Sequence, residues 1–336
     1  ASPIRMSDAS AHDELQEGSK LGPYQLLVAV AQGGMARVWA ARHVPTNRVV
    51  AVKTIRPEFA ANRTYQRLFA DEARFATAVK HSNVCEVFET GEARGVLYIA
   101  MEWVIGESLA RVLKPNRGDT PQPVEARFAA KIIAQCASAL HAAHEVRADD
   151  GSLVRIVHAD VSPQNLMLTT AGRAKLVDFG VARSVASGRV GDFPQIDGKA
   201  AYMAPEHAAG KRLSRLSDVF TLGVCLYEIA TAARPFATGN REATLERLIK
   251  GDFQLPSEVM PEFPRALERI LRRAMAIEPA HRYPSALRLE AALDEWLAYS
   301  GPPIGAAELA DFVKGRAGSI ISEREAAIAR ALGGRA

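Results

Sequence analysis

Near Glu107 the chain changes from mainly strand spacing to mainly helical spacing of its apolar residues, and this change limits the folds that it can adopt. Residues 24–55 alternate in short apolar runs rich in β-branched residues, which predicts three strands. Residues 60–79 have helical spacing instead. Two more strands are predicted at 84–89 and 96–101. The second half is mainly helical, with helices predicted at 124–146, 219–231, 241–250, 264–275 and 285–299.

This order predicts an α+β protein, in which a small β-rich part with one helix precedes a larger, mainly helical part. The 336 residues are enough for such a bilobal domain with a buried core. Hydrophobic residues make up 48% and charged residues 24%, which excludes disorder and coiled coil as the main architecture. The 42 basic and 38 acidic residues are too balanced for a chain built to coat nucleic acid, so no nucleic-acid partner is expected.

Other features point to a reducing compartment and to no membrane segment within this chain. Cys85, Cys136 and Cys225 are far apart and form neither a disulfide framework nor a zinc motif. Residues 1–21 are polar and read as a flexible leader without a secretory signal. The most apolar stretch, 219–233, is interrupted by Glu228 and is too short to span a bilayer.

Residues 301–336 form a predicted helical extension, with helices at 306–313 and 323–332. Its apolar positions favour packing on the mainly helical part. Two alternatives stay open, which are contact with a second chain and a stalk before a membrane anchor.

The strongest chemical signal is an ordered set of short motifs in the second half. Asp160 offers a carboxylate that can accept a hydroxyl proton, and Asn165 and Asp178 offer the hard oxygens that Mg²⁺ prefers. A single motif of this kind is typical of loop caps and turns. The complete set occurs here in order: His158-Ala159-Asp160-Val161-Ser162-Pro163-Gln164-Asn165, Asp178-Phe179-Gly180, Ala204-Pro205-Glu206 and Asp218.

On these motifs the chain resembles the protein kinase family, in particular the eukaryotic-like Ser/Thr kinases of bacteria, over about residues 22–300. The resemblance implies a bilobal protein-kinase fold and transfer of the ATP γ-phosphate to protein hydroxyls. The implied organisation is a leader 1–21, an N-lobe 22–101, a hinge 102–104, a C-lobe 105–300 and an extension 301–336.

The resemblance also assigns the residues that bind nucleotide and metal. Lys53 is the strand lysine that grips the α- and β-phosphates of ATP, and Glu72 is its helix partner. Asp160 is the catalytic aspartate, and Asn165 and Asp178 hold Mg²⁺, with Mn²⁺ as an alternative. The remaining contacts implied for the nucleotide come from the loop glycines Gly33 and Gly34, from Val38, Ala51 and Met167 around the adenine, from a gatekeeper Met101, and from the hinge backbone at Glu102 and Val104.

Three further positions are implied to be structural. Glu206 anchors the activation segment and pairs with a buried Arg282. Asp218 holds the backbone of the catalytic loop, in which His158 packs beside Asp160.

The sequence departs from the family pattern at the phosphate-covering loop and before the catalytic aspartate. Ala31 and Ala36 replace the first and third glycines of that loop, which predicts weaker ATP binding but not its absence. Ala159 replaces the arginine that usually pairs with a phosphate on the activation segment. We therefore expect activity that does not need phosphorylation of Ser184 or Ser187.

A third departure is an exchange of residue types. The family commonly has Lys two residues after the catalytic aspartate, and Thr just after the Gly that precedes the Tyr-x-Ala-Pro-Glu stretch. Here these positions are Ser162 and Lys199. We hypothesise that Lys199 supplies the positive charge beside the γ-phosphate, while the Ser162 hydroxyl bonds Lys199 or Asp160. The alternative is a solvated Lys199.

Two other functions compete with an active Ser/Thr kinase. The first is a pseudokinase scaffold that binds nucleotide or a partner without efficient transfer, which the altered glycine loop and Ser162 motivate. The second is a small-molecule kinase of the antibiotic phosphotransferase type, which would lack Glu206, Asp218 and Arg282. The expected partners of an active kinase are protein substrates and a homodimer for autophosphorylation. The expected location is the cytoplasm, or the cytosolic side of a membrane-anchored kinase.

Overall fold

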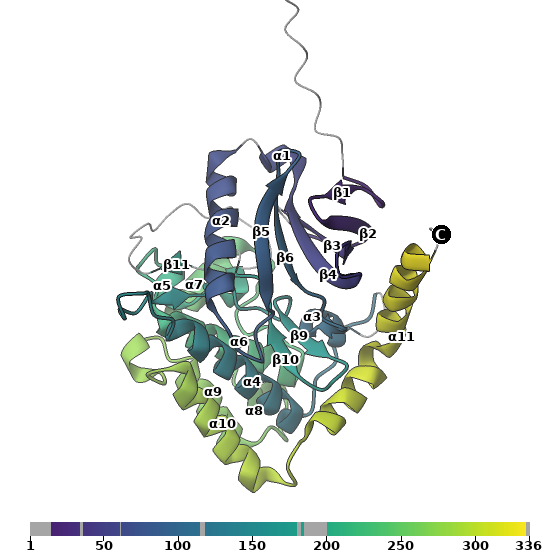
Figure 1. The fold of residues 1–336 in the computed structure, drawn as a ribbon. Coiled ribbons are helices and arrows are strands. Elements are labelled where there is room, and N and C mark those ends of the chain that lie inside the picture. The colour runs from purple at the N-terminus through teal and green to yellow at the C-terminus, as the bar shows by residue number, and fades with distance from the viewer. Residues whose placement is uncertain are drawn as a thin grey trace, which may run out of the picture. The chain divides into compact units, whose positions relative to one another are not determined.

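The chain forms two compact units, which are shown together in the ribbon of Figure 1. The computed structural model describes residues 15–33, 36–60, 62–114, 118–179 and 200–333, and the backbone alone of 183–184. The first unit contains Ala1–Phe69, Phe88–Trp103 and Arg324–Ala336, and the second contains Ala70–Val87 and Val104–Glu323. Most of the predicted leader, residues 1–14, lies outside the described residues.

A six-stranded sheet forms most of the first unit, in the order β1-β2-β3-β4-β6-β5. The three strands predicted over 24–55 are confirmed as β2, β3 and β4. The strand predicted at 84–89 begins later, because Val84 and Cys85 pair with Leu176 within the second unit. The strands are β1 (Lys20–Leu21), β2 (Tyr24–Gln32), β3 (Ala36–His43), β4 (Arg48–Ile55), β5 (Val87–Ala93) and β6 (Val96–Glu102).

The two faces of this sheet differ. One face carries a buried apolar cluster around Trp39, whose Nε1 donates to the Thr54 hydroxyl at 3.2 Å. Because side chains alternate along a strand, Val38, Ala51 and Lys53 lie on the opposite face. The cluster on the first face consists of Leu21, Tyr24, Leu26, Trp39, Ala41, Val50, Val52, Tyr98 and Ala100.

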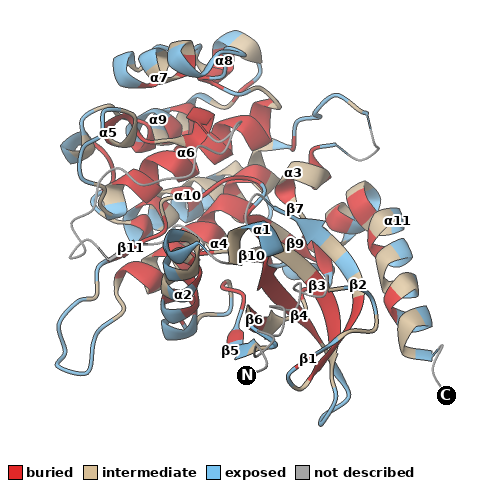
Figure 2. Ribbon diagram, turned by 90° about the horizontal axis from the view of Figure 1, so that it is seen from above, coloured by how far each residue is buried: buried red, intermediate tan, exposed pale blue. Residues whose placement is uncertain are grey.

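The core of the second unit is built on helix α6 (Arg215–Thr231), which is buried on almost every side, as its red ribbon in Figure 2 shows. The helix begins at Ser214, whose hydroxyl accepts from the Leu216 amide in a capping box with Ser217. It ends at Ala232, which takes the left-handed conformation with φ of 59°. Helix α4 (Ala126–His144) packs on α6 with a face of Ala, Ile and Leu residues.

Shorter elements complete the two units. The strands of the second unit are β7 (Gly106–Ser108), β8 (Ile156–Val157), β9 (Leu166–Thr169), β10 (Ala174–Leu176) and β11 (Arg183–Ser184), in the orders β10-β9-β7 and β11-β8. The remaining helices are α1 (Pro57–Ala60), α2 (Arg63–Ala78), α3 (Leu109–Val112), α5 (Pro205–Ala208), α7 (Arg241–Lys250), α8 (Pro256–Val259), α9 (Arg265–Ala274) and α10 (Ala286–Ser300), with 3₁₀ turns at Ala200–Tyr202 and Pro279–His281.

The C-terminal extension is one helix, α11 (Ala306–Gly333), drawn as a continuous yellow ribbon in Figure 1. The prediction of two helices, at 306–313 and 323–332, was therefore wrong. Gly315 and Gly318 do not interrupt α11, because a buried stripe at helical spacing outweighs the cost of about 1 kcal/mol for each interior glycine. That stripe consists of Leu309, Val313, Ala317, Ile321 and Ile328.

The expectation that the extension packs on the helical part is met by only part of α11. Residues up to Glu323 do belong to the second unit, where the Phe312 ring lies 5.4 Å from the ring of Phe128. Residues from Arg324 onward belong to the first unit. None of the helices in the described residues has the length and apolar character needed to cross a bilayer.

Two glycines give opposite predictions for stability. A Cβ on Gly106 would lie 2.2 Å from the carbonyl oxygen of Leu168 on the paired strand, so Gly106→Ala must push β7 away from β9. We expect it to lower the free energy of unfolding by at least about 1–3 kcal/mol. A Cβ on Gly315 would meet no atom within 4 Å, so Gly315→Ala should raise stability by about 0.5–1 kcal/mol. Urea denaturation measures both variants, and equal midpoints would contradict the prediction.

Candidate active site

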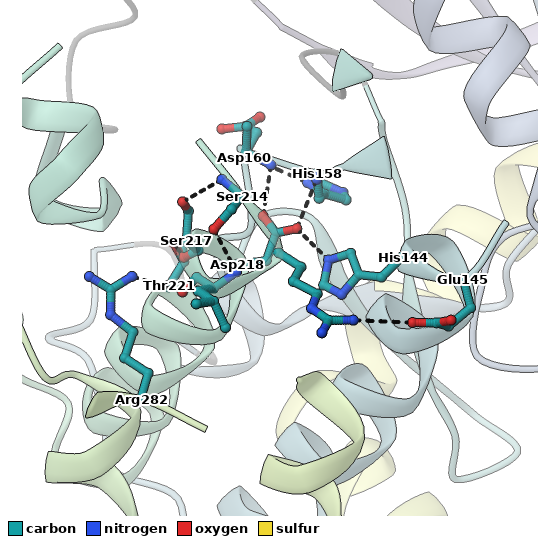
Figure 3. Close-up of polar contacts among 12 residues, drawn as sticks. His144, Glu145, His158, Asp160, Ser214, Ser217, Asp218, Thr221 and Arg282 are labelled. Carbon is teal, nitrogen blue, oxygen red and sulfur yellow. Dashed lines mark hydrogen bonds and ion pairs between the residues drawn. The ribbon is translucent and has the colours of Figure 1, made fainter. Parts of the chain in front are cut away.

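The carboxylate of Asp218, near the start of α6, organises the loop that carries Asp160 (Figure 3). Its Oδ2 accepts from the His158 amide at 2.9 Å and from His144 Nε2 at 2.8 Å. Its Oδ1 accepts from the Ala159 amide at 2.9 Å. Burial acts to raise the pKa of Asp218, but the hydrogen bond and the coulombic interaction with His144, together with the bond from the loop amide, outweigh it and lower that pKa. Asp218 is therefore a buried, ionised anchor for the loop.

This anchor fixes an unusual backbone conformation. Ala159 has φ of 62°, in the left-handed region that costs a residue with a Cβ roughly 1–2 kcal/mol. The strain is offset by the bond from the Ala159 amide to Asp218. It turns the chain so that Asp160, the next residue, is only partly buried, while His158 and Val161 on either side are fully buried.

Asn165 holds the side chain of Asp160 in place. The Nδ2 of Asn165 donates to the backbone oxygen of Asp160 at 2.8 Å and to its carboxylate at 3.0 Å. The loop itself closes through the bond from the Asn165 amide to the Ser162 carbonyl at 2.8 Å. Because its amide nitrogen is used in this way, the oxygen of the Asn165 side chain is the atom that remains for a cation.

Asp178 lies beside this loop through backbone pairing. The Val177 amide donates to the Asn165 carbonyl at 2.9 Å, and Asp178 follows with φ of 65°. The next residue, Phe179, is buried, and its ring lies 4.8 Å from that of His158. The backbone bond from Val177 and the ring contact of Phe179 thus help to hold the motif of Asp178 against the motif of Asp160.

The donor set of this loop fits Mg²⁺. The side-chain amide oxygen of Asn165 and the carboxylate of Asp178 are the hard oxygen ligands that this cation prefers. In the part of the chain that the structure describes, no three His, Cys, Asp or Glu side chains gather as a complete metal site. A sparse protein ligand set is typical of Mg²⁺ that is held jointly with substrate phosphates.

Glu206 and Arg282 form the buried ion pair that the sequence predicts. Arg282 Nη1 and Nη2 bond the two oxygens of Glu206 at 2.8 and 2.7 Å, and Ser217 donates to the same carboxylate at 2.7 Å. The other donors of Arg282 reach the carbonyls of Ala276, Leu216 and Ile277, so all five N–H groups are used. Burial acts to raise the pKa of Glu206, but Arg282 and Ser217 outweigh it and lower that pKa.

The first unit presents the residues predicted to face the nucleotide. Val38 pairs with Lys53 across β3 and β4, and Ala51 pairs with Met101 across β4 and β6. Directly opposite residues share a face of the sheet, so these four side chains form one surface. Lys53 is 5% exposed, and Ala51 is buried beside it.

The glycine-loop alanines adopt ordinary backbone conformations. Ala31 pairs with Val38 within β2 and β3, Ala36 begins β3, and neither has a positive φ. Gly33 also avoids the left-handed region, and its amide donates to the Ala36 carbonyl at 2.8 Å. Left-handed strain, one of the two reasons for predicting weaker ATP binding, is therefore absent at both alanines. The predicted weaker binding itself stays a prediction.

For several predicted site residues the structure gives the position within one unit, and three others lie outside the described residues. Lys53 belongs to the first unit, whereas Glu72 on α2, which is 4% exposed, belongs to the second, so their pairing stays a prediction. Glu102 ends β6 in the first unit. Val104 begins the second segment of the second unit, to which Met167 on β9 also belongs. Gly34, Ser187 and Lys199 lie outside the described residues.

Ser162 is 1% exposed, and its hydroxyl has no hydrogen-bond partner among the described residues. The predicted bond from Ser162 to Asp160 is therefore absent. The other predicted partner, Lys199, lies outside the described ranges, so that half of the hypothesis stays a prediction.

Sequence reasoning missed two supporting residues. His144 donates a hydrogen bond to Asp218, and the Ser217 hydroxyl donates one to Glu206. The available signal for His144 was its spacing, since it lies four residues after the buried Leu140 on the apolar face of α4. Ser217 gave no comparable signal, because it also reads as a helix-capping residue.

Comparisons with known proteins agree with this geometry. Residues 24–295 match the protein kinase domain family. The chain is 38% identical over 306 residues to the tyrosine-protein kinase MasK of Myxococcus xanthus, covering 88% of this chain and 46% of that protein. It is 30% identical over 270 residues to the serine/threonine-protein kinase PrkC of Bacillus subtilis, covering 80% of this chain and 40% of that protein.

A solved structure shows the same fold. A double mutant of the Mycobacterium tuberculosis PknI kinase domain superposes with a TM-score of 0.66 at 25% identity, covering 84% of this chain and 99% of that one. The chain spans less than half the length of the curated relatives MasK and PrkC.

The buried pair gives a stability prediction. Glu206→Ala leaves the guanidinium of Arg282 buried without its anion, and Arg282→Ala leaves the carboxylate of Glu206 without its cation. Each change should lower the free energy of unfolding by about 3–5 kcal/mol. Chemical denaturation measures the loss, and Arg265→Ala is the control, because the Arg265 side chain is 68% exposed beside Glu268. A loss no larger than that of the control would contradict the prediction.

Proposed function

Because the chain belongs to the protein kinase domain family, we propose that it transfers the γ-phosphate of Mg-ATP to serine and threonine hydroxyls of proteins. The observation that carries this proposal is the placement of Asp160, which Asp218 anchors through the loop backbone and Asn165 orients through its side chain. A carboxylate held in this way is suited to accept the proton of an attacking hydroxyl.

The other predicted site residues would neutralise the charge of the phosphates and position the nucleotide. Asn165 and Asp178 supply oxygens for Mg²⁺, which neutralises charge on the phosphates when it is bound. Lys53, with Glu72 as its partner, would bind the α- and β-phosphates from the sheet face that also carries Val38 and Ala51. The hinge backbone at Glu102 and Val104 would bond the adenine.

Two observations favour an active protein kinase over the alternatives. The backbone at Ala31 and Ala36 has no positive φ, so one of the reasons for a pseudokinase, left-handed strain in the glycine loop, does not arise. The buried pair of Glu206 and Arg282 and the anchor Asp218 are present, and these frame a docking surface for a polypeptide in the family. We therefore expect protein substrates, among them a second copy of this chain in a dimer. We place the domain in the cytoplasm, where Mg-ATP is available.

The acceptor residue needs its own measurement, because one relative is a tyrosine-protein kinase. Incubation with Mg²⁺ and labelled ATP, followed by analysis of the phosphorylated amino acids, should give phosphoserine and phosphothreonine. Phosphotyrosine alone would overturn the proposed acceptor class, and no transfer to protein would favour the pseudokinase.

Lys53→Met and Asp178→Asn should each abolish transfer with little effect on the fold. Lys53 acts on phosphate charge and Asp178 on the metal, so both act mainly in the transition state. Autophosphorylation and thermal melting measure the two effects on the same samples. A Lys53→Met protein that phosphorylates itself at the wild-type rate would refute the assignment.

The buried hydroxyl of Ser162 supports the proposed exchange with Lys199. An unpartnered buried hydroxyl is costly, and a charged group that approaches from the activation segment would satisfy it. Under this proposal Lys199 brings the positive charge to the γ-phosphate only when the activation segment is docked.

The exchange predicts a coupled pair of mutations. Lys199→Ala should lower the transfer rate roughly 10²–10³-fold, because one preorganised charge contact is lost. Ser162→Lys alone should help little, since two ammonium groups would crowd one site. The double variant Ser162→Lys, Lys199→Thr should recover activity, which gives a strong coupling in a double-mutant cycle. Full activity of Lys199→Ala, or additive effects, would exclude the exchange.

A further inference from the structure

The end of α11 contacts the hinge. Trp103, between Glu102 and Val104, donates from its indole Nε1 to Glu325 Oε1 at 3.0 Å. The two residues are 222 positions apart in sequence and both belong to the first unit. A hydrogen bond to a carboxylate is stronger than one between neutral groups, so this contact ties the hinge side chain to α11.

An apolar contact accompanies the hydrogen bond. Ile328, one turn further along α11, is 3% exposed and forms a buried cluster with Leu27 and Ala40 of the sheet. Around this cluster lie six partly buried side chains from the strands, the hinge and the last turn of α11: Val28, Val30, Val49, Trp103, Ala331 and Leu332. The segment from Arg324 to Gly333 is thus docked on the sheet by both polar and apolar contacts.

The docked segment lies on the face of the sheet that carries the nucleotide-facing residues. Ala40 pairs directly with Ala51, and it lies two residues from Val38 along β3. Because side chains two apart, or directly opposite, share a face, Ala40 lies on the same face as Val38, Ala51 and Lys53. Ile328 therefore covers the continuation of that face beyond Ala51.

We propose that Arg324–Gly333 forms the outer wall of the nucleotide-binding face, and that Glu325 positions the hinge through Trp103. This inference rests on the proposed function, since it assigns the nucleotide to that face. Glu325 is a positioning residue, because it acts on the backbone beside the adenine through the indole of Trp103. The wall restricts the movement of the hinge and so raises the affinity for nucleotide without taking part in phosphate transfer.

The test compares four single variants of the full chain and the combined variant Glu325→Leu, Trp103→Phe. Glu325→Leu removes the acceptor, Glu325→Gln keeps an acceptor oxygen, and Trp103→Phe removes the donor. Glu323→Leu is the matched control, since it makes the same change of charge and size two residues earlier, where the side chain is exposed. The probe is ADP, whose dissociation constant is measured by isothermal titration calorimetry, with the KM for ATP and kcat measured in parallel.

Glu325→Leu and Trp103→Phe should each raise the dissociation constant of ADP and the KM for ATP about fivefold, the effect of one partly exposed hydrogen bond. The combined variant should be no weaker than either alone, because both remove the same contact. Glu325→Gln should show a smaller loss than Glu325→Leu, because it keeps an acceptor oxygen but not the charge. Glu323→Leu should keep the wild-type values, and kcat should not change. Amide exchange at residues 102–104 should be fastest in Glu325→Leu among the Glu variants.

Two results would overturn the inference while the wild type still phosphorylates protein. One is an ADP affinity of Glu325→Leu equal to that of the control, and the other is an equal loss in Glu325→Gln and Glu325→Leu. The opposite outcome is also distinguishable. If the variants shift the dissociation constant of ADP as predicted but the wild-type protein transfers no phosphate, the proposed function is overturned and the inference stands.

Discussion

One buried carboxylate fixes the backbone of the loop that carries Asp160. Asp218 accepts hydrogen bonds from two successive loop amides and from His144, and these bonds offset the left-handed backbone at Ala159. Without them the strain would relax, and Asp160 would lose its orientation toward Asn165. The loop that carries Asp160 is therefore stabilised by α6, a helix whose own residues are almost all buried.

A second network of hydrogen bonds, around Arg282 and Glu206, holds the same turn of α6. Arg282 uses all of its N–H groups on Glu206 and on three carbonyls, and Ser217, one residue before Asp218, also bonds Glu206. The anchor of the catalytic loop and the anchor of the segment around Glu206 thus share one turn of α6. Such sharing makes the two anchors cooperative, because a shift of that turn disturbs both.

Helix α11 contributes residues to both units. Its buried stripe begins at Leu309 in the second unit and continues to Ile328 in the first, without a break in the helix. Its last turns are docked on the sheet and on the hinge residue Trp103. The chain beyond the family match over residues 24–295 is in this way part of both units.

The sequence alone determined most of the elements and the motifs that mark the family. Periodicity located the strands over 24–55 and the helix Arg241–Lys250, since burial on one face imposes a repeat that the residues display. The ordered motifs predicted the protein kinase family, which the match over residues 24–295 confirms. The roles of Asp160, Asn165 and Asp178 stay predictions. Only the tertiary structure decided the contacts between distant segments. His144 on Asp218, the continuity of α11 through two glycines, and Glu325 on Trp103 each depend on packing between residues far apart in the chain. Local sequence does not encode which distant surface a helix will meet.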